Sequence, residues 1–253
     1  MKQTIIAVIN QKGGVGKTTT AVNLASQLAG KEHDVLLVDL DPQGNATSGL
    51  GIDKSAITAT SYDVLFNRVR LDGAVVPTGR EGLTVLPATP TLAAAEVELV
   101  DLPNREFALR QVLQASNCEY IIIDCPPALG LLTINALTSA NTILIPVQSE
   151  YYALEGLGQL LETIQRVRQG LNPSLDLLGV LLTMYDKRTS LSEQVMDELR
   201  NHFGDKLFTT VIPRNIRLAE APSFGKTIFE HDRWSKGARA YKQLAKEVVK
   251  RVS

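Results

Sequence analysis

The sequence predicts an α/β fold: a doubly wound, mostly parallel sheet with helices on both faces. Three observations support this prediction. Short β-branched runs recur along the chain, helical patterns separate them, and a glycine-rich turn joins the first run to the first helix. The predicted strands are residues 4–9, 35–39, 83–87, 120–124, 142–147, 177–184 and 208–212. These runs are apolar throughout rather than alternating, which is typical of strands covered on both faces.

Helical patterns occupy the intervals between the strands. We predict helices over residues 18–29, 105–115, 131–139, 154–170, 190–203 and 235–252. Strand–helix alternation implies parallel pairing through right-handed crossovers. Residues 44–80 are the least regular section, and we expect loops and short helices there. Because no linker or internal repeat interrupts the pattern, we predict a single domain over residues 1–253.

The charge of the chain is unevenly distributed. The net charge is −1, yet residues 181–253 hold 14 Lys or Arg against 9 Asp or Glu. This basic third fits a patch that contacts phosphates, and it fits a well-solvated surface helix equally well. Aromatic residues make up only 5%, which argues against stacking platforms for single-stranded nucleic acid.

Targeting and redox features of the chain are few. Two cysteines, Cys118 and Cys125, do not make a disulfide framework. The first strand leaves no room for a signal peptide, and no apolar run reaches the ~20 residues of a membrane span. We therefore expect a cytoplasmic protein.

The stretch KGGVGKTTT, residues 12–20, lies between the first predicted strand and helix. The usual phosphate-loop pattern, G-x-x-x-x-G-K-[ST], needs a glycine where this chain has Gln11, and a second lysine, Lys12, follows it. The loop proper consists of Gly13, Gly14, Val15 and Gly16. Its glycines allow backbone N–H groups to face a phosphate at the positive end of the helix dipole.

Three side chains after the loop are candidate ligands of a nucleotide. We expect Lys17 to reach the β- and γ-phosphates and the Thr18 hydroxyl to ligate Mg²⁺. Thr19 would add a contact to the α-phosphate. The order of strand, glycines, lysine, threonine and helix makes a turn that binds nothing a poor alternative.

Carboxylates follow two other predicted strands. Asp39 ends the run VLLVD, with Asp41 two residues into the next loop, and Asp124 ends the run YIIID. Ligands bind at such strand ends, where Asp41 would orient a water or touch Mg²⁺ through water. An Asp-Pro turn explains Asp41 equally well. We interpret Asp124 as a Walker B aspartate that holds Mg²⁺, because the same chain contains the phosphate-loop motif with Lys17.

Taken together, KGGVGKTTT, LVDLDPQGNAT, IIIDCPP, PVQSEYYALEG and IPRNIRLAEAPSFGK resemble the ParA/Soj-type chromosome-partitioning ATPases, within the group that has a deviant Walker A motif. The resemblance covers residues 4–250. It implies a P-loop NTPase fold and an ATPase that uses ATP and Mg²⁺ and forms a homodimer around two nucleotides. It also implies that Lys12 reaches the partner's nucleotide, as an arginine finger does, and that Asp41 positions the attacking water.

The resemblance further implies an adenine contact, a DNA surface and a protein partner. Pro213 and Asn215 resemble the adenine contacts. The residues that resemble the surface for nonspecific double-stranded DNA are Arg188, Arg217, Lys187, Arg214 and Lys226. A ParB-like centromere-binding protein would stimulate a weak ATPase and release the dimer from the nucleoid. Because the chain begins at the first strand, we do not expect the specific operator binding of plasmid relatives that carry an N-terminal helix-turn-helix.

Two other functions occur within this fold. In a MinD-like membrane ATPase that regulates division placement, the last helix would insert into lipid. Here its apolar face is small and valine-rich, with Lys242, Lys246, Lys250 and Arg251 on the other face, which favours packing on the sheet. An iron–sulfur reductase would need two cysteines that converge, and we expect a strand to hold Cys118 and Cys125 apart.

Trp234 and Tyr241 are interpreted as anchors of the last helix. Partitioning of a plasmid or another cargo is a further alternative.

Overall fold

The computed structural model describes residues 3–30, 32–150 and 155–252. The strands are β1 (Thr4–Val8), β2 (Val35–Asp39), β3 (Val76–Arg80), β4 (Leu83–Leu86), β5 (Tyr120–Asp124), β6 (Thr142–Gln148) and β7 (Asp176–Thr183). Within the described residues these seven strands form one sheet in the order β3-β4-β2-β5-β1-β6-β7. Every pairing is parallel except that of β3 with β4 at one edge, so the predicted mostly parallel sheet is confirmed.

Helices cover both faces of this sheet. The longer ones are α1 (Lys17–Leu28), α7 (Leu131–Ser139), α8 (Glu155–Gly170), α9 (Ser190–Phe203) and α12 (Lys236–Val252). The shorter α-helices are α2 (Asn45–Gly49), α3 (Ser61–Leu65), α4 (Leu71–Ala74), α5 (Ala95–Glu98), α6 (Ala108–Leu113), α10 (Ile216–Glu220) and α11 (Ile228–His231). Single 3-10 turns are η1 (Lys54–Ala56), η2 (Pro90–Ala94), η3 (Leu99–Asp101), η4 (Arg105–Phe107), η5 (Gly204–Lys206) and η6 (Ala221–Phe224).

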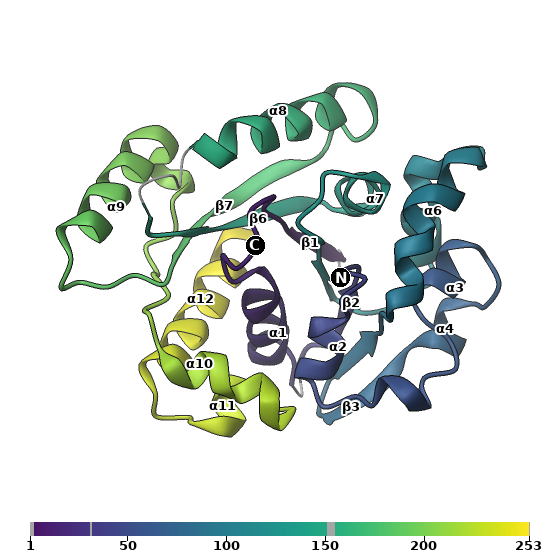
Figure 1. Cartoon of the computed structure of the whole chain (residues 1–253), viewed down its shortest axis with the longest axis horizontal. Helices are drawn as coiled ribbons and strands as arrows, with labels where there is room; N and C mark the ends of the chain where they lie inside the picture. Colours follow the sequence, from purple (N-terminus) through teal and green to yellow (C-terminus); the bar gives the residue numbers. More distant parts are fainter. Residues whose placement is uncertain (1–2, 31, 151–154, 253) are drawn as a thin grey trace.

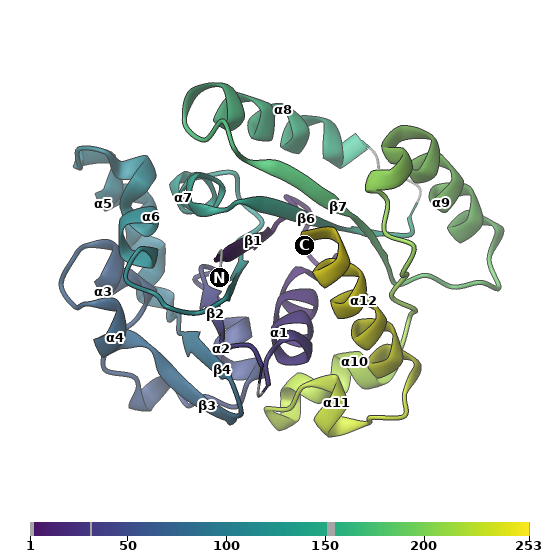
Figure 2. The ribbon, with the colours of Figure 1, turned by 180° about the vertical axis from the view of Figure 1, so that it is seen from behind.

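Two apolar layers explain why the strands are hydrophobic at every position. In β1, Ile5 and Ala7 belong to the layer under α6, α7 and α8, whereas Ile6 and Val8 belong to the layer under α1 and α12. Figure 1 shows α8 on one side of the sheet and α1 and α12 on the other. Figure 2 shows the same two layers from behind, with α6 and α7 on the α8 side. Burial of both faces therefore selects continuous β-branched runs.

Several predicted boundaries differ from the structure. Residues 208–212 are not a strand, because the segment touches β7 only through the isolated bridge Val180↔Leu207 and hydrogen bonds such as that from Phe208 N to Val180 O, at 2.9 Å. The section 44–80 contains strand β3 besides the expected short helices. The predicted helix 105–115 is a 3-10 turn followed by α6. The predicted start of the helix 154–170 lies outside the described residues.

The last helix packs as predicted for a helix that lies on the sheet. Tyr241, Leu244 and Val248 of α12 are buried in the layer shared with α1, and the Tyr241 hydroxyl is 3.1 Å from Thr20 Oγ1. Trp234 was expected to anchor this helix, but it is 76% exposed, so that interpretation is wrong. No helix in the part of the chain that the structure describes is long and apolar enough to cross a membrane.

Candidate nucleotide site

The glycine loop connects β1 to α1 at the carboxyl edge of the sheet. Gly14 and Gly16 have φ values of +76° and +88°, in the left-handed region that side chains disfavour. Gly16 caps α1 without a side-chain hydrogen bond, so the first N–H groups of the helix remain available to an anion. Thr183 Oγ1 donates to Val15 O at 2.8 Å, which ties the loop to β7. Gly13 is exposed and has open space beside it.

Lys17 lies within the loop rather than in solvent. Its side chain is buried, and Nζ donates to Lys12 O at 3.0 Å. Burial lowers the pKa of Lys17, while the charges of Asp124, Cys125 and Asp41 oppose this effect. The loop therefore holds a cation next to the helix N-terminus, where phosphate oxygens would be bound.

Asp124 lies at the carboxyl end of β5, in register with Val8 of β1 and Asp39 of β2. It is fully buried, and within the described residues neither of its carboxylate oxygens has a hydrogen-bond partner. Burial, followed by the charge of Asp39, raises the pKa of Asp124 well above its usual range, against the opposing effects of Thr18 and Lys17. A buried carboxylate without a partner is costly, so the arrangement fits an oxygen-ligated cation such as Mg²⁺.

Asp39 fixes the loop that contains Asp41. Asp39 Oδ2 accepts hydrogen bonds from Thr47 N at 2.8 Å and Thr47 Oγ1 at 2.7 Å, and Oδ1 accepts one from Asp41 N at 3.2 Å. Burial raises the pKa of Asp39 to about 6 although these bonds oppose the shift. Asp41 is itself buried, and its Oδ1 accepts from Gln43 N at 2.9 Å. Asp39 is thus a loop anchor, a role that its position in the sequence did not reveal.

Lys12 forms an ion pair within its own chain. Its Nζ lies 2.8 Å from Glu150 Oε2, and the two side chains are 42% and 45% exposed. Glu150 follows β6 and also accepts a hydrogen bond from Gln148 Nε2. The Lys12 backbone N–H donates to Asn10 Oδ1 at 3.0 Å, and Asn10 Nδ2 donates to Pro146 O at 2.7 Å. The loop therefore presents Lys12 at the surface, paired with a carboxylate.

An apolar cavity of about 380 Å³ opens beside the loop. Pro213 and Asn215, the predicted adenine contacts, both line it, but Asn215 Oδ1 is already occupied as the cap of α10, accepting from Arg217 N at 2.9 Å. The lining also contains residues that the sequence did not indicate: Thr183, Met184, Ile212, Leu218 and Tyr241. The size and apolar character of the cavity suit a purine base.

Four of the five predicted DNA residues lie on two adjacent segments. The bridge Tyr185↔Pro213 places the loop with Lys187 and Arg188 beside the segment in which Arg214 precedes α10 and Arg217 lies in its first turn. Arg188 pairs with Asp186, at 2.7 Å, and Arg217 pairs with Glu220, at 2.9 Å. The fifth residue, Lys226, instead lines a cavity of about 260 Å³ that also contains Thr18 and Thr19.

The two cysteines are held apart, and in the described part of the chain they do not form a metal site. Cys118 precedes β5 and Cys125 follows it, so the strand separates them, as predicted. Within the described residues no group of three or more His, Cys, Asp or Glu side chains is arranged to hold a metal ion. Part of the motif PVQSEYYALEG, residues 151–154, lies outside the described residues.

Comparison with known proteins identifies close relatives along the whole chain. A family model described as an AAA domain matches residues 3–177. The chromosome partitioning protein ParA of Myxococcus xanthus is 55% identical, over 98% of this chain and 88% of its own length. The sporulation initiation inhibitor protein Soj of Bacillus subtilis is 56% identical, over 97% of this chain and 98% of its own.

Solved structures show the same fold with nucleotide bound. Cobyrinic acid a,c-diamide synthase from Mycobacterium smegmatis, with bound ADP and magnesium, has a TM-score of 0.85 and 40% identity, covering 98% of this chain and 95% of its own. The same protein with a bound ATP analogue and magnesium has a TM-score of 0.86 and 40% identity, with the same coverage. The activity in that name belongs to the relative, whose identity to this chain is lower than that of the ParA and Soj proteins.

Proposed function

This chain belongs to the ParA/Soj family of chromosome-partitioning ATPases, and we propose that ATP joins two copies of it into a dimer that binds double-stranded DNA without sequence preference. Hydrolysis, stimulated by a ParB-like centromere-binding protein, would separate the dimer and release the DNA. The whole chain, residues 1–253, would act as one ATPase domain in the cytoplasm, associated with the nucleoid. No membrane partner is proposed, because α12 buries its apolar face against α1.

The observation that carries the nucleotide site is the carboxylate of Asp124, which has no hydrogen-bond partner among the described residues and lies beside Lys17 at the start of α1. The carboxylate and the Thr18 hydroxyl would hold Mg²⁺, directly or through water, and the ion would neutralise phosphate charge. Lys17 would bind the β- and γ-phosphates, and the N–H groups of Gly13, Gly14, Val15 and Gly16 would surround them. Thr19 would contact the α-phosphate, with the base in the apolar cavity.

Hydrolysis would then depend on two side chains on opposite sides of the γ-phosphate. Asp41 would orient a water whose oxygen bonds to the γ-phosphorus while the bond to the β–γ bridging oxygen breaks. Lys12 from the partner subunit would stabilise the charge that develops on the transferring group. ATP would thus be neutralised partly by each subunit, which is why it would favour the dimer.

DNA binding would use phosphate contacts rather than base contacts. Four exposed cations lie on adjacent segments, Lys187 and Arg188 before α9 and Arg214 and Arg217 at the start of α10, and Lys226 would add a further cation. Such contacts give affinity without sequence reading and make binding salt-dependent. A dimer doubles the surface, so a nucleotide that drives dimerisation also drives DNA binding.

A DNA-binding titration tests the proposal. Fluorescence anisotropy of a labelled duplex is measured with Mg-ATP, with Mg-ADP and without nucleotide, over a range of salt concentrations. We expect tight binding only with Mg-ATP, equal on unrelated duplex sequences and weaker at high salt. Binding that is independent of ATP, or absent in its presence, would contradict the proposal.

A further inference from the structure

The positive charge of the last third of the chain is concentrated on one helix. Residues 181–253 hold 14 Lys or Arg and 9 Asp or Glu, whereas α12 alone holds six Lys or Arg and one Glu. The rest of this region is therefore neutral overall. The positive charges around Arg188 and Arg217 are thus offset by acidic residues elsewhere in this region.

The charges of α12 form a stripe along its exposed side, which we call the α12 stripe: Lys236, Arg239, Lys242, Lys246 and Lys250. These positions recur every three or four residues and so share one face of the helix. All five are exposed, and within the described residues none of their side chains forms an ion pair or hydrogen bond. The other two charged residues, Glu247 and Arg251, turn inward and pair with each other at 2.9 Å.

Unlike the cations of the α12 stripe, Arg188 and Arg217 are paired with carboxylates. Arg188 makes two hydrogen bonds to Asp186, at 2.9 and 2.7 Å, and Arg217 lies 2.9 Å from Glu220 and 3.8 Å from Asp232. A phosphate must compete with those carboxylates for each arginine. No carboxylate among the described residues pairs with the cations of the stripe, so their full positive charge is available to attract a polyanion.

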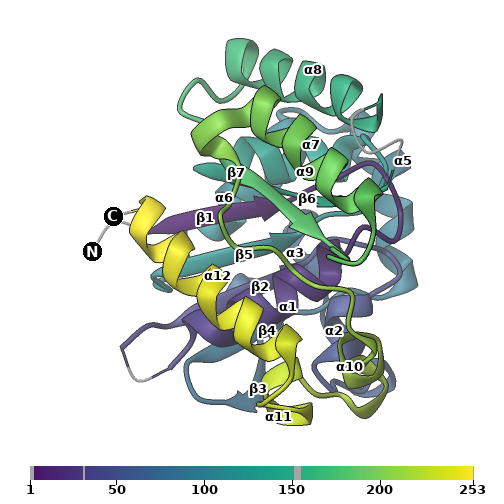
Figure 3. The same ribbon diagram turned by 90° about the vertical axis from the view of Figure 1, so that its left-hand side faces the viewer.

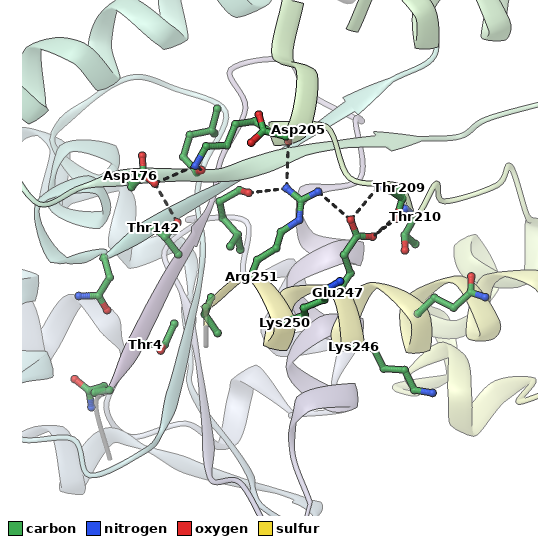
Figure 4. Close-up of a pocket in the computed structure, with 17 residues that line it drawn as sticks. Thr4, Thr142, Asp176, Asp205, Thr209, Thr210, Lys246, Glu247, Lys250 and Arg251 are labelled. Carbon is green, nitrogen blue, oxygen red and sulfur yellow. Dashed lines mark hydrogen bonds and ion pairs between the residues drawn. The ribbon is translucent and has the colours of Figure 1, made fainter. Parts of the chain in front are cut away.

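Helix α12 lies on the same side of the molecule as α9, which Arg188 precedes, and α10, which contains Arg217. Figure 3 shows α12 crossing the front of the view, with α9 above it and α10 beside its first turns. The stripe ends at an open groove of about 1140 Å³ at the amino ends of β1, β6 and β7, which Lys246 and Lys250 border together with Thr4, Thr142 and Asp176 (Figure 4). The glycine loop is at the opposite edge of the sheet, so bound nucleotide leaves this end free.

We propose that the α12 stripe is a main phosphate-contacting surface for duplex DNA, which lies along α12 and crosses toward Arg188, in the loop before α9, and Arg217, on α10. This inference rests on the proposed function and extends its DNA site to a helix outside the predicted residues. From Lys236 to Lys250 the helix rises ~21 Å, which equals about six base-pair steps of ~3.4 Å. A row of cations of that length matches the charge of a phosphate backbone and reads no bases.

The test compares two triple variants with the wild type in the Mg-ATP titration. One replaces three cations of the stripe (Lys242→Gln, Lys246→Gln and Lys250→Gln). The matched control replaces three exposed arginines on the other face of the sheet (Arg110→Gln, Arg166→Gln and Arg168→Gln). Glutamine keeps helix propensity, and thermal unfolding checks that each variant is folded.

We expect the stripe variant to bind DNA about 10- to 100-fold more weakly, with a slope of log affinity against log salt reduced by about one per lysine removed. The control should keep the wild-type affinity and slope. Equal DNA binding by the stripe variant and the wild type would overturn this inference and leave the proposed function intact. Failure of the wild type to bind DNA with ATP would overturn both. Loss of binding to vesicles of anionic lipid, with DNA binding unchanged, would assign the stripe to a membrane surface and also overturn it.

Discussion

Lys12 has two alternative partners, Glu150 of its own chain and the nucleotide of the partner subunit. In the isolated chain its ammonium pairs with Glu150 at 2.8 Å, whereas in the proposed dimer it contacts a phosphate of the partner's nucleotide. It must leave Glu150 to do so. A half-exposed ion pair is worth at most about 1 kcal/mol, so a triphosphate is a sufficient competitor.

Replacing Glu150 by glutamine should therefore favour the dimer. Without the carboxylate, Lys12 no longer loses its pair on dimerisation, and we expect the dimer dissociation constant with Mg-ATP to fall about 2- to 5-fold. Analytical ultracentrifugation measures this constant. Glu162→Gln is the control, because it removes an exposed pair with Arg166 on α8 and should change nothing. A weaker dimer for Glu150→Gln would show that Glu150 supports association instead.

Asp41 should be needed for turnover and not for binding. If it only orients water, Asp41→Ala keeps ATP and DNA binding and lowers the rate of ATP hydrolysis about 100-fold or more. A phosphate-release assay measures the rate. Asp53→Ala, which removes an exposed carboxylate that caps Ser55 N at 2.9 Å, should hydrolyse at the wild-type rate. Normal hydrolysis by Asp41→Ala would remove Asp41 from the mechanism.

Residues of the glycine-loop and strand-end motifs could be predicted from the sequence, whereas most of the wall of the apolar cavity could not. The positions of Gly16, Lys17 and Asp124 follow from a motif between a strand and a helix. The adenine cavity, by contrast, draws Thr183, Ile212 and Tyr241 from three separate segments. Each of them reads as an ordinary core residue, because nothing in its local pattern distinguishes a cavity wall from packed interior.

Among the helices, α12 is held in place by Arg251, which we predicted to lie with the solvated lysines of that helix. Arg251 donates to Leu178 O and to Leu207 O, both at 2.9 Å, and its guanidinium lies 4.1 Å from the centre of the Phe208 ring. It also pairs with Glu247 (Figure 4). The prediction that Arg251 belongs to the outer face is therefore wrong. Successive residues of a helix are about 100° apart, so helical periodicity places Arg251 beside the buried Leu244 and away from Lys250; the prediction of exposure rested on its charge.

Removal of Arg251 should destabilise the protein. Arg251→Ala leaves two carbonyl oxygens without their donor, and we expect the free energy of unfolding to fall by about 2 kcal/mol. Lys250→Ala, one position earlier and exposed, should change it by less than about 0.5 kcal/mol. Urea unfolding followed by circular dichroism measures both. Equal effects of the two substitutions would mean that the contacts of Arg251 contribute no stability.

The edge strand β3 was harder to predict than the strands with two buried faces. The central strand β5 was predicted at its observed bounds, residues 120–124, because both of its faces are buried. The edge strand β3 has the sequence VPTGR and is only partly buried, so it gives no continuous apolar signal. Residues 208–212 show the opposite case, a buried apolar segment that is not a strand. Phe208 and Ile212 are buried like strand residues, but only isolated contacts join the segment to β7.

At the scale of the whole molecule, each function is placed on a different surface. The nucleotide loop is at the carboxyl edge of the sheet, Lys12 is half-exposed at that edge, and α12, which carries the stripe, crosses the side of the molecule shown in Figure 3. Dimerisation through the first surface would leave the stripe of each subunit free. This separation allows ATP to control DNA binding without contact between the two ligands.

In the proposed dimer each active site takes a lysine from the other subunit, and mixing two inactive variants distinguishes this arrangement from a site built by one chain alone. Lys12→Ala lacks the lysine that is given to the partner, and Asp41→Ala lacks the residue that orients water. A mixed dimer holds one complete site, made of Asp41 from the first variant and Lys12 from the second. We predict that each variant alone hydrolyses ATP at background rate and that an equimolar mixture recovers up to about a quarter of the wild-type rate. A mixture no more active than the two separate variants, or a Lys12→Ala protein that hydrolyses ATP alone at the wild-type rate, would contradict the claim.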